Sequence, residues 1–288
     1  MYVLSAAEIR NWDQFTINNE PIASIDLMER AAARCFEWII QQGFQKNQFY
    51  IFCGKGNNGG DGLAIARLLM QSGYKISIYI LNTEEPGSAD FQENLKRLQK
   101  LNAAIRLINV VADLPEVQKD GIVVDALFGT GLSRPVAGIA ENIIALINDS
   151  RAKVISIDLP SGMFADKSSV NNMIVRAHFT LTFQCYKLGL LVAENELFTG
   201  KVILLQIGLH PAFVPGNLPV TKILTQKLIE KLYRPRSSFA HKGTFGHALI
   251  MGGSKGKIGA MILAVRACLH TGAGLTSASL PGCGYVII

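Results

Sequence analysis

This chain of 288 residues has few cysteines, no long apolar run and no dense cluster of positive charge. Its five cysteines form no CxxC pair, which excludes the usual spacings of zinc and thioredoxin-like sites, and their odd number argues against a disulfide framework. No run approaches the roughly 18 apolar residues that span a bilayer. The opening MYVLSAAEIR also lacks the charged and then apolar pattern of a secretory signal. We therefore expect no membrane association and a cytoplasmic location.

Positive charge is in modest excess, with 28 Lys and Arg against 22 Asp and Glu and a formal net charge of +6. The basic residues are scattered and form no stripe, which argues against nucleic acid as a partner and fits a small phosphorylated ligand better. The histidines are isolated, so their spacing indicates neither a zinc or redox-metal cluster nor a Ser-His-Asp arrangement.

What the chain does contain is a regular alternation of apolar runs and helical patterns. Ser5 and Ser24 are expected to cap two helices that precede the first strand. Strands are expected at 49–53, 75–81, 104–108, 122–128, 153–159, 175–185 and 201–207, and helices at 60–72, 89–101 and 138–149. This order predicts an α/β fold of the Rossmann-like, doubly wound kind, with a mostly parallel sheet and helices on both faces.

A glycine-rich loop, GKGNNGGDG at 54–62, follows the first strand and opens into a helix. Its glycines let the backbone approach a ligand closely, and the helix N-terminus offers free N–H groups, so phosphate is the expected ligand. The loop is neither GxGxxG nor GxxxxGK[ST], because its centre is Asn57-Asn58, and ordinary dehydrogenase and kinase functions fit it poorly. The two amides either bind a cation or a sugar, or are only turn residues that tolerate a left-handed backbone.

Two further loops follow later strands and should reach the same edge of the sheet. In VVDALFGTGLSRP, Asp125 lies among apolar residues, where an ionised carboxylate needs N–H groups or a cation as partners, unless it is only a turn or helix cap. Residues 129–135 form a second glycine-rich loop, in which Arg134 either holds a phosphate or is an ordinary solvated arginine.

The third loop, in VISIDLPSGM, follows an apolar strand that ends at Asp158. This carboxylate is either a general acid and base or the cap of its own turn. Together, Asn58, Asp125 and Ser161 could supply amide, carboxylate and hydroxyl or carbonyl oxygens to one monovalent or weakly held cation.

The motifs GKGNNGGDGLAIARLL, VVDALFGTGLSRP and IDLPSGM, in this order and spacing, resemble the NAD(P)HX epimerase family. The segments LSAAEIRNWD and SIDLMERAA are similar to its N-terminal helices, so the resemblance covers about residues 1–220. It implies a Rossmann-like isomerase, a homo-oligomer of two or more copies, whose substrate is the small molecule NADHX or NADPHX, the hydrated form of NADH or NADPH. It also implies a potassium ion on Asn58, Asp125 and Ser161, a catalytic Asp158 facing the damaged nicotinamide ring, and substrate binding by Asn57, Asn58, Gly59, Gly60, Asp61, Gly129, Thr130, Gly131, Leu132, Ser133, Arg134, Pro135 and Asp158.

The chemistry of such a substrate fits this set of residues. The hydrated ring carries a hydroxyl on carbon 6, beside a ring nitrogen whose lone pair can expel it and give an iminium that water attacks from either face. One carboxylate alternating between acid and base can manage both proton transfers, and no redox cofactor is required. Opening of the ring at the same carbon is an alternative route.

The segment 241–288 carries a second resemblance. Its start, HKGTFGHALIMGGSKGKIG, is similar to the opening of the ADP- or ATP-dependent NAD(P)HX dehydratase domain, a ribokinase-like fold. The resemblance implies an epimerase domain at 1–220, a linker at 221–240 and an incomplete dehydratase domain at 241–288. The full-length protein would then be bifunctional, and ADP or ATP would serve only the completed dehydratase domain. Because 241–288 contains no Asp or Glu, we expect no dehydratase activity from the 288 residues alone.

A non-catalytic nucleotide- or RNA-binding module of Rossmann-like fold is the alternative, because a fold alone does not establish activity. The intact NNGGD motif and Asp158 favour the enzyme. The sequence also offers no basic, aromatic-studded face of the kind that binds RNA.

Overall fold

The computed structural model describes residues 2–216 and 221–285, and the chain divides into two compact units, Met1–Ile223 and Leu224–Ile288. The first unit is built on a seven-stranded sheet in the order β3-β2-β1-β4-β5-β6-β7, and each strand runs parallel to its neighbours. The strands are β1 Gln48–Cys53, β2 Lys75–Leu81, β3 Ile105–Ile108, β4 Ile122–Ala126, β5 Lys153–Ile157, β6 Phe179–Phe183 and β7 Lys201–Leu205. The helices are α1 Ala6–Asn19, α2 Ser24–Ile40, α3 Asn57–Gln71, α4 Ala89–Lys100, α5 Ile139–Asp149 and the short α6 Glu196–Thr199. This confirms the predicted Rossmann-like doubly wound class.

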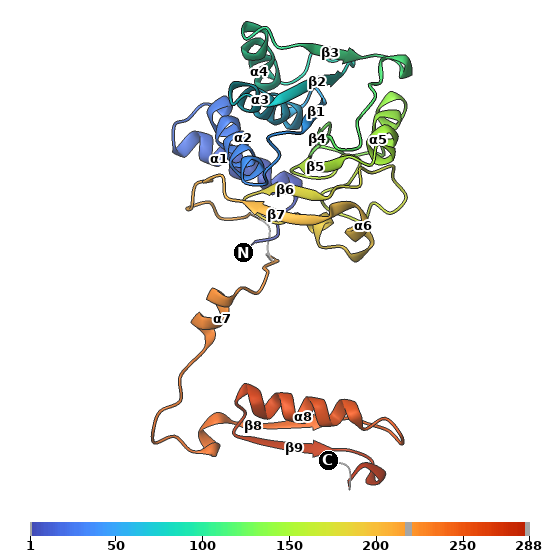
Figure 1. Ribbon diagram of the computed structural model, residues 1–288. Helices are drawn as coiled ribbons and strands as arrows, with labels where there is room; N and C mark the ends of the chain where they lie inside the picture. The colour runs from blue at the N-terminus through green and yellow to red at the C-terminus, as the bar shows by residue number, and fades with distance from the viewer. Residues whose placement is uncertain (1, 217–220, 286–288) are drawn as a thin grey trace. The chain divides into compact units, whose positions relative to one another are not determined.

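Helices cover both faces of the sheet, with α2, α3 and α4 on one face and α5 on the other (Figure 1). One hydrophobic core lies under the first group of helices and includes Ile39 of α2, Leu69 of α3 and Leu98 of α4. A second core lies under α5 and includes Ile143 and Ile147. The central strands β1, β4 and β5 are buried between these two layers, which explains why they read as continuous apolar runs.

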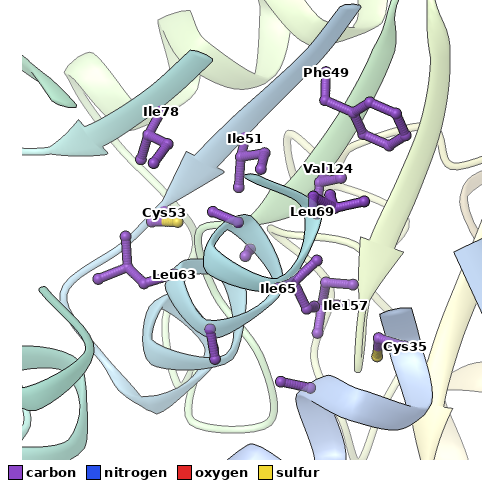
Figure 2. Close-up of a cluster of buried hydrophobic side chains, with 14 of the residues drawn as sticks. Cys35, Phe49, Ile51, Cys53, Leu63, Ile65, Leu69, Ile78, Val124 and Ile157 are labelled. Atoms are coloured by element: carbon purple, nitrogen blue, oxygen red, sulfur yellow. The ribbon is translucent and has the colours of Figure 1, made fainter. Parts of the chain in front are cut away.

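Helix α3 lies at the centre of the first core (Figure 2). Its side chains Leu63, Ile65 and Leu69 are fully buried and belong to the same cluster as Ile51 of β1 and Val124 of β4. Because α3 follows β1 directly, this packing fixes the position of the glycine-rich loop between them.

The helix N-termini differ from the predictions in two places. Ser5 caps α1 as predicted, since its side chain accepts a hydrogen bond from the Glu8 N–H and completes a capping box. Ser24 is not the cap of α2: it is the first helical residue, and its hydroxyl donates instead to the Asp90 carboxylate at 2.6 Å. The start of α3 lies three residues earlier than expected, at Asn57, because Gly56 takes the capping position with an extended backbone.

Several strands end earlier than the apolar runs that predicted them. β4 ends at Ala126 and β5 at Ile157, so Phe128 and Asp158 belong to loops. Asp158 has a left-handed backbone with φ of 64°, which is incompatible with a continuing strand. Because the strands end early, the polar residues predicted to form the site, such as Asp158, lie in loops and not in the sheet.

The second unit, taken by itself, is one βαβ piece: β8 His247–Met251 and β9 Leu275–Ser279 pair in parallel and are joined by α8 Gly259–Thr271. The helix α7 Gln226–Leu232, capped by Thr225, precedes it. That order of elements matches the strand, turn and helix expected there, whereas the assignment of 241–288 to a dehydratase domain stays a prediction. In the part of the chain that the structure describes, no helix is long and apolar enough to cross a membrane.

Candidate functional site

A cavity of about 640 Å³ lies at the carboxyl ends of the strands, where the chain order reverses between β1 and β4. The loops after β1, β4 and β5 line it, as the three motifs predicted, and α1 and the segment after β6 complete its wall. The predicted residues that line it are Asn57, Asn58, Asp61, Gly129, Thr130, Gly131, Leu132, Ser133, Arg134 and Asp158.

Gly59, Gly60 and Pro135 were predicted to bind substrate but do not line this cavity. A Cβ on Gly59 would lie 1.7 Å from the Gly54 carbonyl oxygen, and one on Gly60 would lie 2.7 Å from the Met28 sulfur. The Gly60 N–H already donates to the Gly56 carbonyl at 3.0 Å. The two glycines therefore let α3 pack closely, while free N–H groups for an anion belong to the turn before Gly60.

Asp158 presents its carboxylate at the cavity beside a lysine. The Lys187 ammonium donates to Asp158 Oδ1 at 2.6 Å, and also to Thr182 Oγ1 and to the Phe183 carbonyl. The Lys187 side chain is fully buried and that of Asp158 is 13% exposed. A buried ammonium is stable only with such partners, so Lys187 holds Asp158 in one orientation and compensates its charge.

Three more carboxyl groups line the same cavity: Asp13 from α1, Asp61 from α3 and Glu85 from the loop after β2. Burial and the negative charge of Asp158 raise the pKa of Asp13 to about 7, although Lys187 opposes the shift. Burial, together with Asp158 and Asp13, also raises the pKa of Asp61 well above its usual range. The site thus gathers several acidic groups around one buried ammonium, and Asp13 is poised to exchange a proton near neutral pH.

Asp125 is fully buried behind the cavity rather than in its wall. Its carboxylate accepts hydrogen bonds from Ser156 Oγ at 2.7 Å, from the Ser161 N–H at 2.9 Å and from the Ser161 hydroxyl. Burial raises the pKa of Asp125, and these hydrogen bonds partly offset the shift. Ser161 Oγ in turn accepts from the Phe128 N–H at 2.9 Å, so the loops after β4 and β5 are tied together.

The Asn58 amide is buried, and neither its oxygen nor its nitrogen has a hydrogen-bond partner among the described residues. Gly129 packs so closely on it that a Cβ there would lie 3.3 Å from Asn58 Oδ1. An unpaired buried amide is costly, and such atoms call for a missing partner. Asn58, Asp125 and Ser161 thus offer oxygens of the kinds that bind a hard cation, in loops that meet.

The basic residues Arg10, Lys55 and Arg134 also line the cavity. Arg134 is exposed, which leaves its guanidinium free to reach an anion in the opening. Positive charge at the rim and acidic groups deeper inside fit a ligand with a phosphorylated end and a neutral or positively charged reacting end.

The sequence had not singled out Lys187 or Asp13. Asp13 lies in a segment expected only to be a helix, and Lys187 follows the strand expected at 175–185. Asp13 reaches the cavity through folding, because Trp12 Nε1 donates to the His210 carbonyl at 2.9 Å and fixes the turn of α1 that carries it. A lysine just after an apolar strand was the one available signal for Lys187, because a lysine there is seldom buried without an acidic partner.

The family model described as YjeF-related protein N-terminus matches residues 24–189. The bifunctional NAD(P)H-hydrate repair enzyme of Moorella thermoacetica is 36% identical over 98% of this chain and 54% of its own length. The NAD(P)H-hydrate epimerase of Limosilactobacillus fermentum is 36% identical over 69% of this chain and 94% of its own length. The chain thus spans about half the length of the bifunctional relatives.

Among solved structures, yeast YNL200c matches 77% of this chain and all of its own with a TM-score of 0.59 at 18% identity, a likeness of fold. The family model covers the glycine-rich loop, the loops after β4 and β5, and Lys187, so it includes most of the cavity. The chain is similar to NAD(P)H-hydrate epimerases over most of their length. On this evidence it belongs to the YjeF-related protein N-terminus family.

Proposed function

We propose that this chain is an NAD(P)H-hydrate epimerase, which interconverts the R and S forms of hydrated NADH and NADPH in nicotinamide nucleotide repair. The observation that carries the proposal is the cavity-facing pair of Asp158 and Lys187, set between a helix N-terminus and a second glycine-rich loop. Relatives named as epimerases at 35–36% identity support it. They favour an enzyme over a non-catalytic nucleotide- or RNA-binding module.

The substrate phosphates would bind at the first turn of α3, where helix N–H groups and the helix dipole attract anions. Arg134 and the loop 129–134 would hold the other side of the dinucleotide. The damaged ring would then lie deeper, beside Asp158. Proton transfer to the leaving hydroxyl and from the incoming water is the chemistry that this carboxylate supplies.

The proposal is tested by giving the purified chain one isolated epimer of hydrated NADH and following the other by chromatography. We expect equilibration of the two forms far faster than in buffer alone. Conversion no faster than the buffer control would contradict the proposed function.

A potassium ion fits Asn58, Asp125 and Ser161, because the orphaned Asn58 amide and the buried Asp125 carboxylate both gain from a cation. When bound, the ion would offset the charge of Asp125 and of the substrate phosphates. The three side chains would position the loops after β1, β4 and β5 around the phosphates.

The potassium site predicts a stability difference between salts. In potassium chloride at about ten times the dissociation constant, binding to the native state adds about 1.4 kcal/mol, so the melting temperature should exceed that in choline chloride of equal strength by about 2–4 °C. Asn58→Ala should abolish the difference, whereas Asn11→Ala, an exposed asparagine of α1, should keep it. Equal melting temperatures of the unmodified chain in both salts would rule out the site.

We infer that residues 241–288 correspond to the beginning of a dehydratase domain, because the bifunctional relatives match almost the whole chain. The whole protein would then also dehydrate the S epimer with ADP or ATP. The 288 residues alone should yield no NADH from that epimer when ADP or ATP is added, and nucleotide-dependent recovery of NADH would refute this. A cytoplasmic location and a homo-oligomer of two or more copies stay predictions from the sequence.

A further inference from the structure

Epimerisation inverts carbon 6 of the hydrated ring, so both faces of that ring take part in the reaction. The leaving hydroxyl departs from one face of the ring, and the incoming water must add to the opposite face. Each event needs a proton carrier within hydrogen-bond reach on its own side. A single carboxylate can serve both faces only if the ring turns over or the carboxylate travels around it.

The acidic groups Asp13 and Asp158 reach the cavity from two different elements of the fold. Asp158 extends from the end of β5, and Lys187 holds it in place. Asp13 extends from α1, which also contributes Ile9, Arg10 and Trp12 to the wall. A flat ring held between α1 and the end of β5 would therefore present one face to each carboxyl group.

The position of Asp13 is fixed from both sides along α1. Trp12 donates to the His210 carbonyl at 2.9 Å, and the His210 N–H donates to Thr16 Oγ1 at 2.9 Å. The start of the helix is held as well, since the Ala6 N–H donates to the Asp166 carboxylate. A residue on so well anchored a helix can act at a defined point of the cavity.

We propose that Asp13 is a second catalytic carboxyl group, which works with Asp158 on the opposite face of the ring. The inference rests on the proposed epimerase function and names a group that the three sequence motifs do not include. Asp13 and Asp158 share one proton between them, and the direction of the reaction decides which of the two carries it at the start.

In one direction of the reaction, a proton leaves Asp13 and another arrives on Asp158. Asp13, as the acid, gives its proton to the hydroxyl on carbon 6; the carbon–oxygen bond breaks, water leaves, and the ring nitrogen forms the iminium. A water molecule on the other face then bonds to carbon 6 while Asp158 accepts its proton, which restores a neutral ring. The reverse direction starts with the proton on Asp158 and ends with it on Asp13, and the proton passes back between turnovers.

The charges around Asp13 suit this role. Burial and the negative charge of Asp158 raise its pKa to about 7, so that near neutrality a large share of the molecules carry a proton on Asp13. The only buried cation beside the pair, among the described residues, is Lys187, which forms its ion pair with Asp158 rather than with Asp13. The other charged groups that line the cavity are Asp61 from α3, Arg10 from α1, and Lys55, Glu85 and Arg134 from the loops.

The experiment compares Asp13→Asn, Asp158→Asn and the unmodified chain in water enriched in oxygen-18. Asp149→Asn, an exposed aspartate at the end of α5, is the matched control. Both the rate of epimerisation and the label incorporated into each starting epimer are measured, together with the melting temperature of every variant. The unmodified chain should incorporate one solvent oxygen for each inversion.

Each site variant should lose at least 10²-fold in inversion but keep hydroxyl exchange on the face of the remaining carboxyl group. Asp13→Asn should therefore label one epimer without inverting it, and Asp158→Asn should label the other. A merely structural role for Asp13 would not produce this opposite pattern. The unmodified rate should also fall above pH 7, as Asp13 loses its proton, and Asp149→Asn should match it throughout.

Inversion by Asp13→Asn within about threefold of the unmodified rate would overturn the inference and leave the epimerase function intact. A folded Asp13→Asn that exchanges neither epimer would overturn it too, because Asp13 would then act on binding rather than on one face. Retention of the original oxygen during inversion would indicate ring opening and exclude the water-leaving steps. If the unmodified chain inverts neither epimer, the proposed function itself fails.

Discussion

Asp158→Asn is expected to slow epimerisation by about 10² or more while the chain keeps its fold and its affinity for the substrate. Asparagine is close in shape to aspartate and tolerates the left-handed backbone at this position, where φ is 64°. Its amide oxygen can still accept the hydrogen bond from Lys187. What the variant loses is a group that can take up and release a proton. Steady-state conversion of one epimer measures the effect.

A loss of activity by Asp158→Asn must be separated from a loss of stability, because Lys187 is fully buried and would face no carboxylate in the variant. The double variant Asp158→Asn/Lys187→Met removes both charges. We expect it to melt at a higher temperature than the single variant and to remain inactive. Near-normal turnover by folded Asp158→Asn would contradict the catalytic assignment.

Gly59→Ala is expected to destabilise the first unit by about 3 kcal/mol or more and to reduce activity at least tenfold. The added Cβ would lie 1.7 Å from the Gly54 carbonyl oxygen and 3.1 Å from the Gly54 nitrogen, so the backbone at the end of β1 has to move. Because residues 54–58 line the cavity, that movement would displace the loop expected to hold the phosphates. Urea denaturation measures the first effect and the epimerase assay the second.

Gly56→Ala is the matched control for stability. A Cβ at Gly56 meets nothing within 4 Å, and its φ of −84° suits any residue. This variant should unfold within about 1 kcal/mol of the unmodified chain. If Gly59→Ala were as stable as Gly56→Ala, the close approach of α3 to the end of β1 would not be needed for the fold.

The parallel sheet and the meeting of the three loops could be predicted from the sequence, because strands that alternate with helices run parallel and bring their carboxyl ends to one edge of the sheet. Asn58, Gly129 and Asp158 were named on that basis, and all of them line the cavity. The apolar neighbours of Asp125 also indicated that its carboxylate needs partners. The structure supplies hydrogen bonds from the Ser156 hydroxyl and the Ser161 N–H, and the sequence did not identify Ser156 as a donor.

Asp13 could not be predicted, because nothing near it in the sequence indicates that it approaches Asp158. For Lys187 the available signal is its position just after an apolar strand, which does not indicate its partner. Asp13 lies on a helix whose polar residues look solvated, and its place in the cavity depends on the contact between Trp12 and His210. Gly59 and Gly60 have a role in packing that the sequence does not indicate, because their lack of a Cβ lets α3 approach Gly54 and Met28. Substrate binding by these two glycines stays a prediction.

The docking of α1 also affects the order in which the site forms during synthesis. The hydrogen bond between Trp12 and His210 joins residues 198 positions apart, and the bridge from Val3 reaches Tyr186. Contacts over such a separation form late, since a long loop must close first. A chain emerging from the ribosome can thus present Asp158 at a partly built sheet before residue 210 is available to hold Asp13 beside it. Nascent chains would then contain the sheet and its loops but not the finished acid–base pair.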